Sequence, residues 1–204
     1  VRKGRFSDYA GFARRQSFGL ASSFLKSLSA RNILLLLSAV VILAFFGRNL
    51  KDIVFVSVMA LAASFSTIYK RTIRVPSAVE LVTLGTVITG VAYGPLVGAL
   101  FGIVTTIASE IISSGVDMNT LFYAVARGLA GGFAQVMMVS FGWSVVMAGL
   151  VALVIFHVVS DFIYVVSGGI EAIPKIIYYL VVNTLFNLIV FAFFGNLLLG
   201  FARL

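Results

Sequence analysis

Residues 143–166 read WSVVMAGLVALVIFHVVSDFIYVV, and this stretch decides the class of protein. Among these 24 residues one side chain, that of Asp161, is formally charged at neutral pH. As an α-helix the stretch would be about 36 Å long, whereas the hydrocarbon core of a bilayer is about 30 Å thick. The sequence therefore predicts a membrane-spanning helix over residues 143–166.

Apolar runs of similar character flank this stretch on both sides. The 204-residue chain is 61% hydrophobic and 11% charged, whereas soluble domains are about 25% charged. A mean hydropathy of +1.12 leaves too little polar surface for a water-facing shell. We expect an all-α integral membrane protein whose domain at 51–204 is a six-transmembrane-helix bundle, multi-pass in the cell (cytoplasmic) membrane. The five further runs are residues 53–69, 79–93, 95–113, 120–141 and 174–199.

The first 50 residues form a separate region, with a basic tail followed by a short apolar helix at 33–46. Seven of the fifteen Lys and Arg residues lie in the first 31 positions, which is typical of a cytosolic segment on anionic lipid. We expect no nucleic-acid partner. A helix of 14 residues is about 21 Å long and short for a span. We expect it to be interfacial or re-entrant, and a tilted seventh span or a signal peptide are the alternatives.

Polar residues of the predicted spans gather toward one side of the membrane. The turns at Gly94 and Gly142 are short and uncharged, whereas the loops at 70–78, 114–119 and 167–174 are longer and polar. Successive connections lie on opposite sides, so the long loops share one side. A charge inside a membrane costs about 2.5 kcal/mol or more without a partner or a wet cavity. We therefore predict a ligand pocket at this side, formed by Glu80, Glu110, Arg127, His157, Asp161, Asn183 and Asn187.

Structural explanations compete with the ligand role at most of these positions. Glu110 and Arg127 could form a buried ion pair between two helices. His157 and Asp161, four residues apart, suit metal ligands, a proton relay or a hydrogen bond that locks the helix. Asn183 and Asn187 could join helices, and Tyr179 is typical of an aromatic belt. We find no catalytic motif in the sequence, and expect a protein that is not an enzyme and has no cofactor or metal.

Small residues recur at the four-residue spacing that lets helix backbones approach closely. The helices expected at 95–113 and 120–141 each carry such a stripe, and we predict that their glycines pack against neighbouring helices. These glycines are Gly94, Gly98, Gly102, Gly128 and Gly132.

Three stretches resemble the substrate-binding S component of energy-coupling-factor (ECF) transporters. Residues 80–112 read ELVTLGTVITGVAYGPLVGALFGIVTTIASEII, with a Gly-Pro turn and a glycine-striped helix. Residues 121–137 read LFYAVARGLAGGFAQVM, with an aromatic start and a Gly-rich middle. Residues 178–200 read YYLVVNTLFNLIVFAFFGNLLLG, an Asn-rich final helix. The likeness extends over about residues 53–204.

The resemblance implies a six-helix subunit that binds a vitamin or related micronutrient for uptake. It implies as partners a transmembrane coupling subunit and two ATPase subunits, with the loop at 70–78 capping the pocket. In the family, a small-residue motif on the first helix contacts the coupling subunit. The nearest match here is Ala60 with Ser64, where serine replaces the family's second alanine.

Two other functions fit the same sequence. A cell-shape protein resembling MreD would be a helical membrane scaffold that needs no ligand. A proton-coupled carrier or an intramembrane enzyme would use His157 and Asp161.

Overall fold

The computed structural model describes residues 50–73, 78–117, 119–169, 171 and 173–203. The expected short helix at 33–46 and most of the region at 1–50 lie outside these residues. Within them the chain is helical and contains no strand, so the predicted all-helical class is confirmed. The elements are α3 (Leu50–Phe65), η1 (Ile68–Arg71), α4 (Val82–Tyr93), α5 (Pro95–Ile112), α6 (Asn119–Phe141), α7 (Val145–Gly168), α8 (Ile173–Val190), η3 (Phe191–Gly195) and α9 (Asn196–Arg203).

The described residues form a bundle of six helices in which α8, η3 and α9 make one continuous helix. Five of the six are long and apolar enough to cross a membrane. The side chains on their outer surface are largely apolar, as at Val139, Phe162 and Phe193, which are 69%, 70% and 75% exposed. Such a surface is stable against lipid and not against water. The chain is thus a multi-pass helical membrane protein.

Helix α4 is the exception, because it is short and lies at the centre. Its 12 residues extend about 18 Å, less than the thickness of the hydrocarbon core. All of them except Ala92 are buried, and α4 contacts α3, α5, α6, α7, α8 and α9. The expected span at 79–93 is therefore wrong at its start: residues 78–81 are not helical, and Glu80 instead accepts a hydrogen bond from the Thr83 backbone N–H.

Glycines bring α4, α5 and α6 into backbone contact at what we call the glycine seam, formed by Gly90, Gly98 and Gly131. A Cβ atom at Gly90 would lie 2.5 Å from the Gly131 carbonyl oxygen, and one at Gly98 would collide with the backbone of Gly90. Helices in lipid gain no hydrophobic energy by associating, so close packing of this kind holds them together.

A π-helical turn, η3, lies within the last helix. Its first residue, Phe191, is fully buried, and its ring occupies the space beside Gly149 on α7, where a Cβ atom would be 2.6 Å away. A π turn adds one residue to a helical turn and so changes which face the following residues present. The π turn does not interrupt the last helix, which continues from Ile173 to Arg203 as a single apolar segment.

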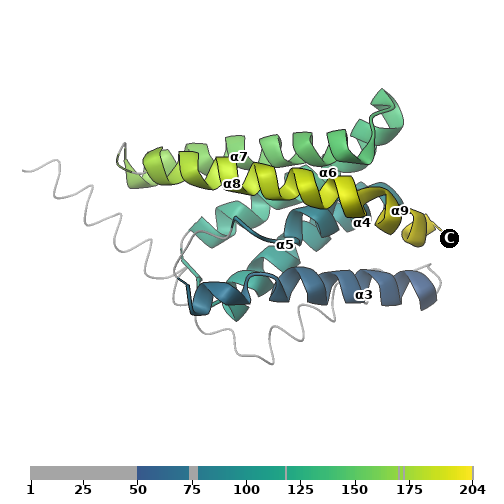
Figure 1. The fold of residues 1–204 in the computed structure, drawn as a ribbon, viewed down its shortest axis with the longest axis horizontal. Coiled ribbons are helices and arrows are strands. Elements are labelled where there is room, and N and C mark those ends of the chain that lie inside the picture. Colours follow the sequence, from purple (N-terminus) through teal and green to yellow (C-terminus); the bar gives the residue numbers. More distant parts are fainter. Residues whose placement is uncertain (1–49, 74–77, 118, 170, 172, 204) are drawn as a thin grey trace, which may run out of the picture.

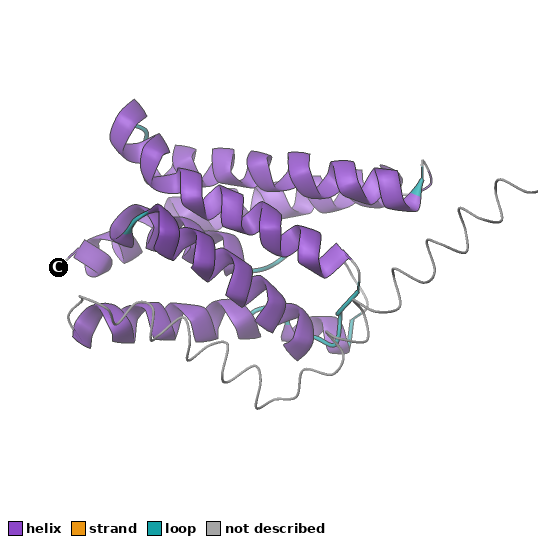
Figure 2. Ribbon diagram, turned by 180° about the vertical axis from the view of Figure 1, so that it is seen from behind, coloured by secondary structure: helices purple, strands orange, loops and turns teal. Residues whose placement is uncertain are grey.

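The two ends of the bundle differ in their connections. At one end α4 meets α5 at Gly94, and α6 is followed by a short turn to α7. At the other end lie η1 and the connections from α5 to α6 and from α7 to α8 (Figures 1 and 2). There Thr67 donates a hydrogen bond to the Ser109 carbonyl, and Asp117 caps α6 by accepting from the Thr120 N–H. The functional candidates lie near this second end.

Candidate functional site

A small polar cavity lies between η1, α5, α6, α7 and α8, close to the start of α4. The cavity volume is about 20 Å³, which is enough for about one water molecule. Three of the predicted ligand residues, Glu80, Glu110 and Arg127, line it. The full lining is Thr67, Glu80, Val82, Thr106, Ser109, Glu110, Tyr123, Arg127, Phe156 and Tyr179.

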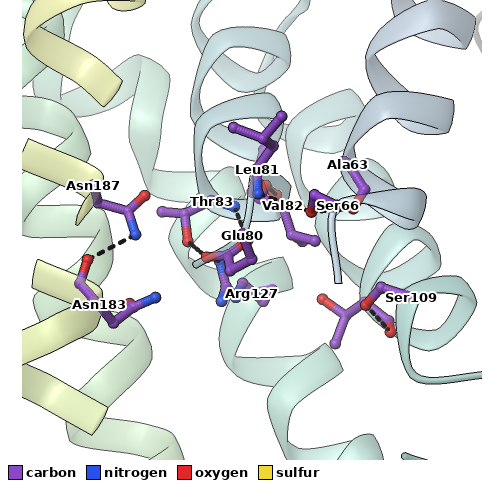
Figure 3. Close-up of polar contacts among 12 residues, drawn as sticks. Ala63, Ser66, Glu80, Leu81, Val82, Thr83, Ser109, Arg127, Asn183 and Asn187 are labelled. Carbon is purple, nitrogen blue, oxygen red and sulfur yellow. Dashed lines mark hydrogen bonds and ion pairs between the residues drawn. The ribbon is translucent and has the colours of Figure 1, made fainter. Parts of the chain in front are cut away.

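Glu80 and Arg127 form a buried ion pair on one side of the cavity (Figure 3). Arg127 Nη1 lies 2.8 Å from Glu80 Oε1, and the two residues are 4% and 2% exposed. The carboxylate also accepts hydrogen bonds from the Thr83 hydroxyl and backbone N–H, at 2.6 and 3.0 Å. Glu80 thus caps α4 and fixes the arginine of α6 at the same time.

Arg127 has more hydrogen-bonding capacity than the described residues use. Its Nε makes no hydrogen bond among them, and its Nη1 contacts Glu80 as a charge without hydrogen-bond geometry. The guanidinium carbon lies 4.0 Å from the centre of the Phe156 ring, which offers cation–π attraction but no acceptor. The Thr106 hydroxyl, also on the lining, is buried and has no hydrogen-bond partner among the described residues.

Lys70 and Glu110 form a second ion pair at the edge of the cavity. Lys70 Nζ lies 2.8 Å from both carboxylate oxygens of Glu110, and the two side chains are 15% and 9% exposed. The Glu110–Arg127 pair considered from the sequence is therefore wrong. Arg127 pairs with Glu80, which precedes α4, and Glu110 pairs with Lys70 of η1. The sequence places these charges toward one end of the bundle but does not determine the rotation of each helix.

His157 and Asp161 on α7 belong to a second polar group, which reaches the cavity wall through α8. His157 Nδ1 lies 2.9 Å from Asp161 Oδ2, and its Nε2 lies 3.3 Å from Asn183 Oδ1. Asn183 donates from Nδ2 to the Ala78 carbonyl at 2.8 Å. Asn187, one turn further along α8, donates to the Asn183 backbone carbonyl and keeps a buried Oδ1 with no partner among the described residues.

All seven predicted ligand residues therefore lie in two adjoining groups, joined by the segment Ala78–Leu81. Sequence reasoning missed several residues of the lining. Thr106 lies in an apolar run, and Tyr179 was interpreted as part of an aromatic belt. Lys70, which pairs with the lining residue Glu110, was placed in a loop. Among the residues that the structure describes, no three of His, Asp and Glu are grouped as metal ligands.

Comparison with known proteins gives no family for this chain. No protein-family model, curated protein or solved structure matches it. The identification that the structure itself supports is that of a multi-pass helical membrane protein in a lipid bilayer.

The residues predicted to contact a coupling subunit lie inside the bundle of this chain. Ala60 and Ser64 are 4% and 0% exposed, whereas Val58, Leu61 and Phe65 form the exposed part of α3. A partner that binds to α3 would contact these exposed side chains first. A contact through Ala60 and Ser64 stays a prediction.

The glycines predicted for helix packing differ in their surroundings. A Cβ atom at Gly102 would lie 2.7 Å from the Arg127 carbonyl oxygen, and one at Gly128 would lie 2.8 Å from the Ile103 side chain. Gly94 has a φ of 104° at the turn between α4 and α5, a region that favours glycine. At Gly132 a Cβ atom would have no neighbour closer than 3.9 Å.

Proposed function

We propose that this chain is the membrane-embedded substrate-capture subunit of an importer of the energy-coupling-factor type, located in the cell membrane. It would bind a vitamin or related micronutrient in the polar cavity and depend on a transmembrane coupling subunit and two ATPase subunits for energy. The chain itself would have no enzymatic activity.

The observation that carries the proposal is the unused hydrogen-bonding capacity of Arg127. A buried donor without a partner costs about 1–3 kcal/mol, and more when the group is charged. Here the Nε and Nη1 donors and the Thr106 hydroxyl belong to two residues that line the same cavity. A ligand that carries an acceptor, such as a carbonyl or ring nitrogen, would satisfy these groups and recover that free energy.

The charges around the cavity suggest the overall charge of the ligand. Two carboxylates, Glu80 and Glu110, are paired with two cations, Arg127 and Lys70. A ligand with net charge would be left without a counter-charge in a region shielded from water, at a high cost. The site therefore suits an uncharged polar molecule or a zwitterion.

The size of the cavity requires a movement before any micronutrient can enter. The cavity volume of about 20 Å³ is far below the roughly 300 Å³ or more that is typical of ligand pockets. The Lys70–Glu110 pair is the more exposed of the two ion pairs. Opening of this pair would widen the cavity at its edge while Glu80 and Arg127 keep their positions.

The test uses two threonines and native mass spectrometry. Protein released from its own membranes in mild detergent is expected to carry a small molecule of defined mass. Thr106→Val removes a hydroxyl from the cavity, whereas the matched control Thr89→Val removes one that is bonded to the Gly85 carbonyl on α4. Thr106→Val should reduce the bound fraction about five- to tenfold, as expected for one lost hydrogen bond, and Thr89→Val should leave it unchanged.

The same measurement separates this proposal from a second candidate function. The small size of the cavity favours a scaffold without a ligand, as in MreD-like cell-shape proteins. A protein that carries no small molecule in native spectra, and that instead co-purifies with wall-synthesis or cytoskeletal proteins, would overturn the importer proposal in favour of the scaffold. Equal loss of ligand in Thr106→Val and Thr89→Val would remove the cavity from the binding site.

A further inference from the structure

The polar group on α7 and α8 has a hydrogen-bond arrangement that the importer proposal does not use. His157 is 4% exposed and Asn183 is fully buried. The imidazole faces an oxygen atom at each of its two ring nitrogens: Asp161 Oδ2 at Nδ1 and Asn183 Oδ1 at Nε2.

The orientation of the Asn183 amide is fixed by its other contact. Its nitrogen lies 2.8 Å from the Ala78 carbonyl oxygen, which can only accept, so this end of the amide must be the NH₂ group. The amide oxygen consequently points to His157 Nε2 and can only accept there. His157 must therefore donate from Nε2.

The other ring nitrogen faces a carboxylate, so one further proton is needed between them. A neutral imidazole has one N–H and one lone pair. With Nε2 as the donor, the lone pair of Nδ1 would face Asp161 Oδ2 at 2.9 Å unless a proton lies on one of the two atoms. The pair His157–Asp161 thus holds one proton more than a neutral imidazole beside an ionised carboxylate.

We propose that His157, Asp161 and Asn183 form a proton-binding site whose occupancy controls the position of the segment Ala78–Leu81 at the polar cavity. When the proton leaves, the one remaining imidazole N–H stays with the carboxylate, because hydrogen bonds to charged acceptors are stronger. The lone pair of Nε2 then faces the amide oxygen. The amide turns over so that its NH₂ group donates to Nε2, and the Ala78 carbonyl loses its donor.

The consequence for the cavity follows from the sequence distance between Ala78 and Glu80. One residue, Val79, separates Ala78, whose carbonyl is held by Asn183, from Glu80, whose carboxylate is held by Arg127. Release of Ala78 would thus act directly on the wall of the cavity. The segment is otherwise held through the Leu81 N–H to Ser66 at 3.0 Å and the Val79 N–H to the Tyr69 hydroxyl at 3.3 Å.

The surroundings of the imidazole contain few other groups that could take up this proton. The Tyr179 ring of α8 lies edge-on at 5.2 Å between ring centres, and Phe156 lies at 5.3 Å. On α7 the Ser160 hydroxyl donates to Asp161 Oδ1. Arg127 of α6 is stacked on Phe156, and Glu80 is paired with Arg127, so both already have a partner of opposite charge.

Two features of the chain allow the protonation of His157 and the movement of the segment Ala78–Leu81 to be measured separately. It contains one histidine and no cysteine. Nitrogen-15 NMR of histidine-labelled protein in nanodiscs, with any affinity tag free of histidine, reports the protonation of this one imidazole. A cysteine introduced at the exposed position Val79 carries a unique nitroxide label, whose mobility by electron paramagnetic resonance reports the segment.

The expected result is a joint transition of the two signals. As the pH rises, the imidazole should lose the Nε2 proton and keep the Nδ1 proton. The mobile fraction of the label at residue 79 should rise with the same midpoint pH. We expect a rise of about tenfold, which corresponds to one lost hydrogen bond. A label at Met147, exposed near the other end of α7, should not change. Asn183→Leu should leave the imidazole titrating while the label stays constant, whereas Asn187→Leu, one turn away, should keep the two signals joined.

Three results would overturn the proposal. The first is a label at residue 79 that does not follow the imidazole in the otherwise unchanged chain, and the second is a neutral imidazole that keeps its proton on Nε2. The third is an imidazole with one unchanging protonation state between about pH 5 and pH 8, where histidine ordinarily changes its charge. The significance of the coupling for uptake rests on the proposed ligand cavity. Neither measurement needs a ligand, however, so failure here and absence of a bound micronutrient are distinguishable.

Discussion

The polar cavity and the glycine seam hold the same three helices, α4, α5 and α6, by opposite means. At the seam, Gly90, Gly98 and Gly131 bring backbones together and leave no space for an added Cβ atom. At the cavity, a buried ion pair joins the start of α4 to α6 and leaves two arginine nitrogens without hydrogen bonds among the described residues. The seam gains stability from close packing, whereas the cavity retains an unfavourable group. That difference is consistent with the proposed role of the cavity in binding and with a role of the seam in stability.

The largest expected effect comes from breaking the buried ion pair. Glu80→Gln keeps the size of the side chain but leaves the Arg127 guanidinium buried at 4% exposure without a counter-charge. Removing one partner of such a pair costs about 3–5 kcal/mol of folding free energy. The loss would be measured as a shift in the unfolding equilibrium in detergent micelles.

A double variant provides the control for this prediction. In Glu80→Gln combined with Arg127→Met neither charge remains, so much of the lost stability should return, because apolar residues can replace a buried ion pair at little cost. Binding of the co-purified ligand should still be absent in the double variant, because Arg127 is missing. A Glu80→Gln protein as stable as the unsubstituted chain would contradict the view that this pair is isolated from water.

Most of the fold follows from the sequence because membrane helices depend on local properties. The apolar runs and the Gly94 and Gly142 turns placed the ends of α5 and α6 within a few residues of their observed positions. The start of α4 was missed, since the helix begins where Glu80 caps it and the run of apolar residues carries no sign of that cap. A central position for α4 was also unpredictable, because hydropathy does not distinguish lipid from a protein interior.

The candidate site could be predicted in its location but not in its pairings. Loop lengths place Glu80, Glu110 and Arg127 toward the same side of the membrane. Which two of them meet depends on the rotation of α5 and α6, and that rotation is set by contacts such as Gly98 against Gly131. Lys70, the actual partner of Glu110, lies outside the apolar pattern altogether.

An intermediate effect is expected from two adjacent glycines of α6. A Cβ atom at Gly131 would collide with the backbone of Gly98, which cannot move aside, whereas one at Gly132 would have no neighbour closer than 3.9 Å. Gly131→Ala should cost about 1–3 kcal/mol of stability as an overpacked contact. Gly132→Ala should be neutral or stabilising by up to about 1 kcal/mol, the difference in helix propensity.

These two variants also test the division between seam and cavity. The thermal stability of each is measured beside the fraction of bound ligand at a temperature where both are folded. Gly131→Ala should lower the unfolding temperature and leave the ligand fraction nearly constant. If Gly131→Ala instead removed the ligand at full stability, the seam would have to be counted as part of the binding site.

The smallest expected effect is that of Glu110→Gln, the same substitution as Glu80→Gln made in the outer ion pair. Lys70 is 15% exposed at its side chain, and its flexible stem lets the ammonium group reach water when Glu110 no longer holds it. The loss of stability should be at most about 1 kcal/mol, as for other ion pairs near water. If this pair closes the cavity, its removal should raise the rates of ligand binding and release together and leave the affinity nearly unchanged. A stability loss equal to that of Glu80→Gln would show that the two ion pairs are buried alike, and the cavity would then have no edge that opens more easily than the rest.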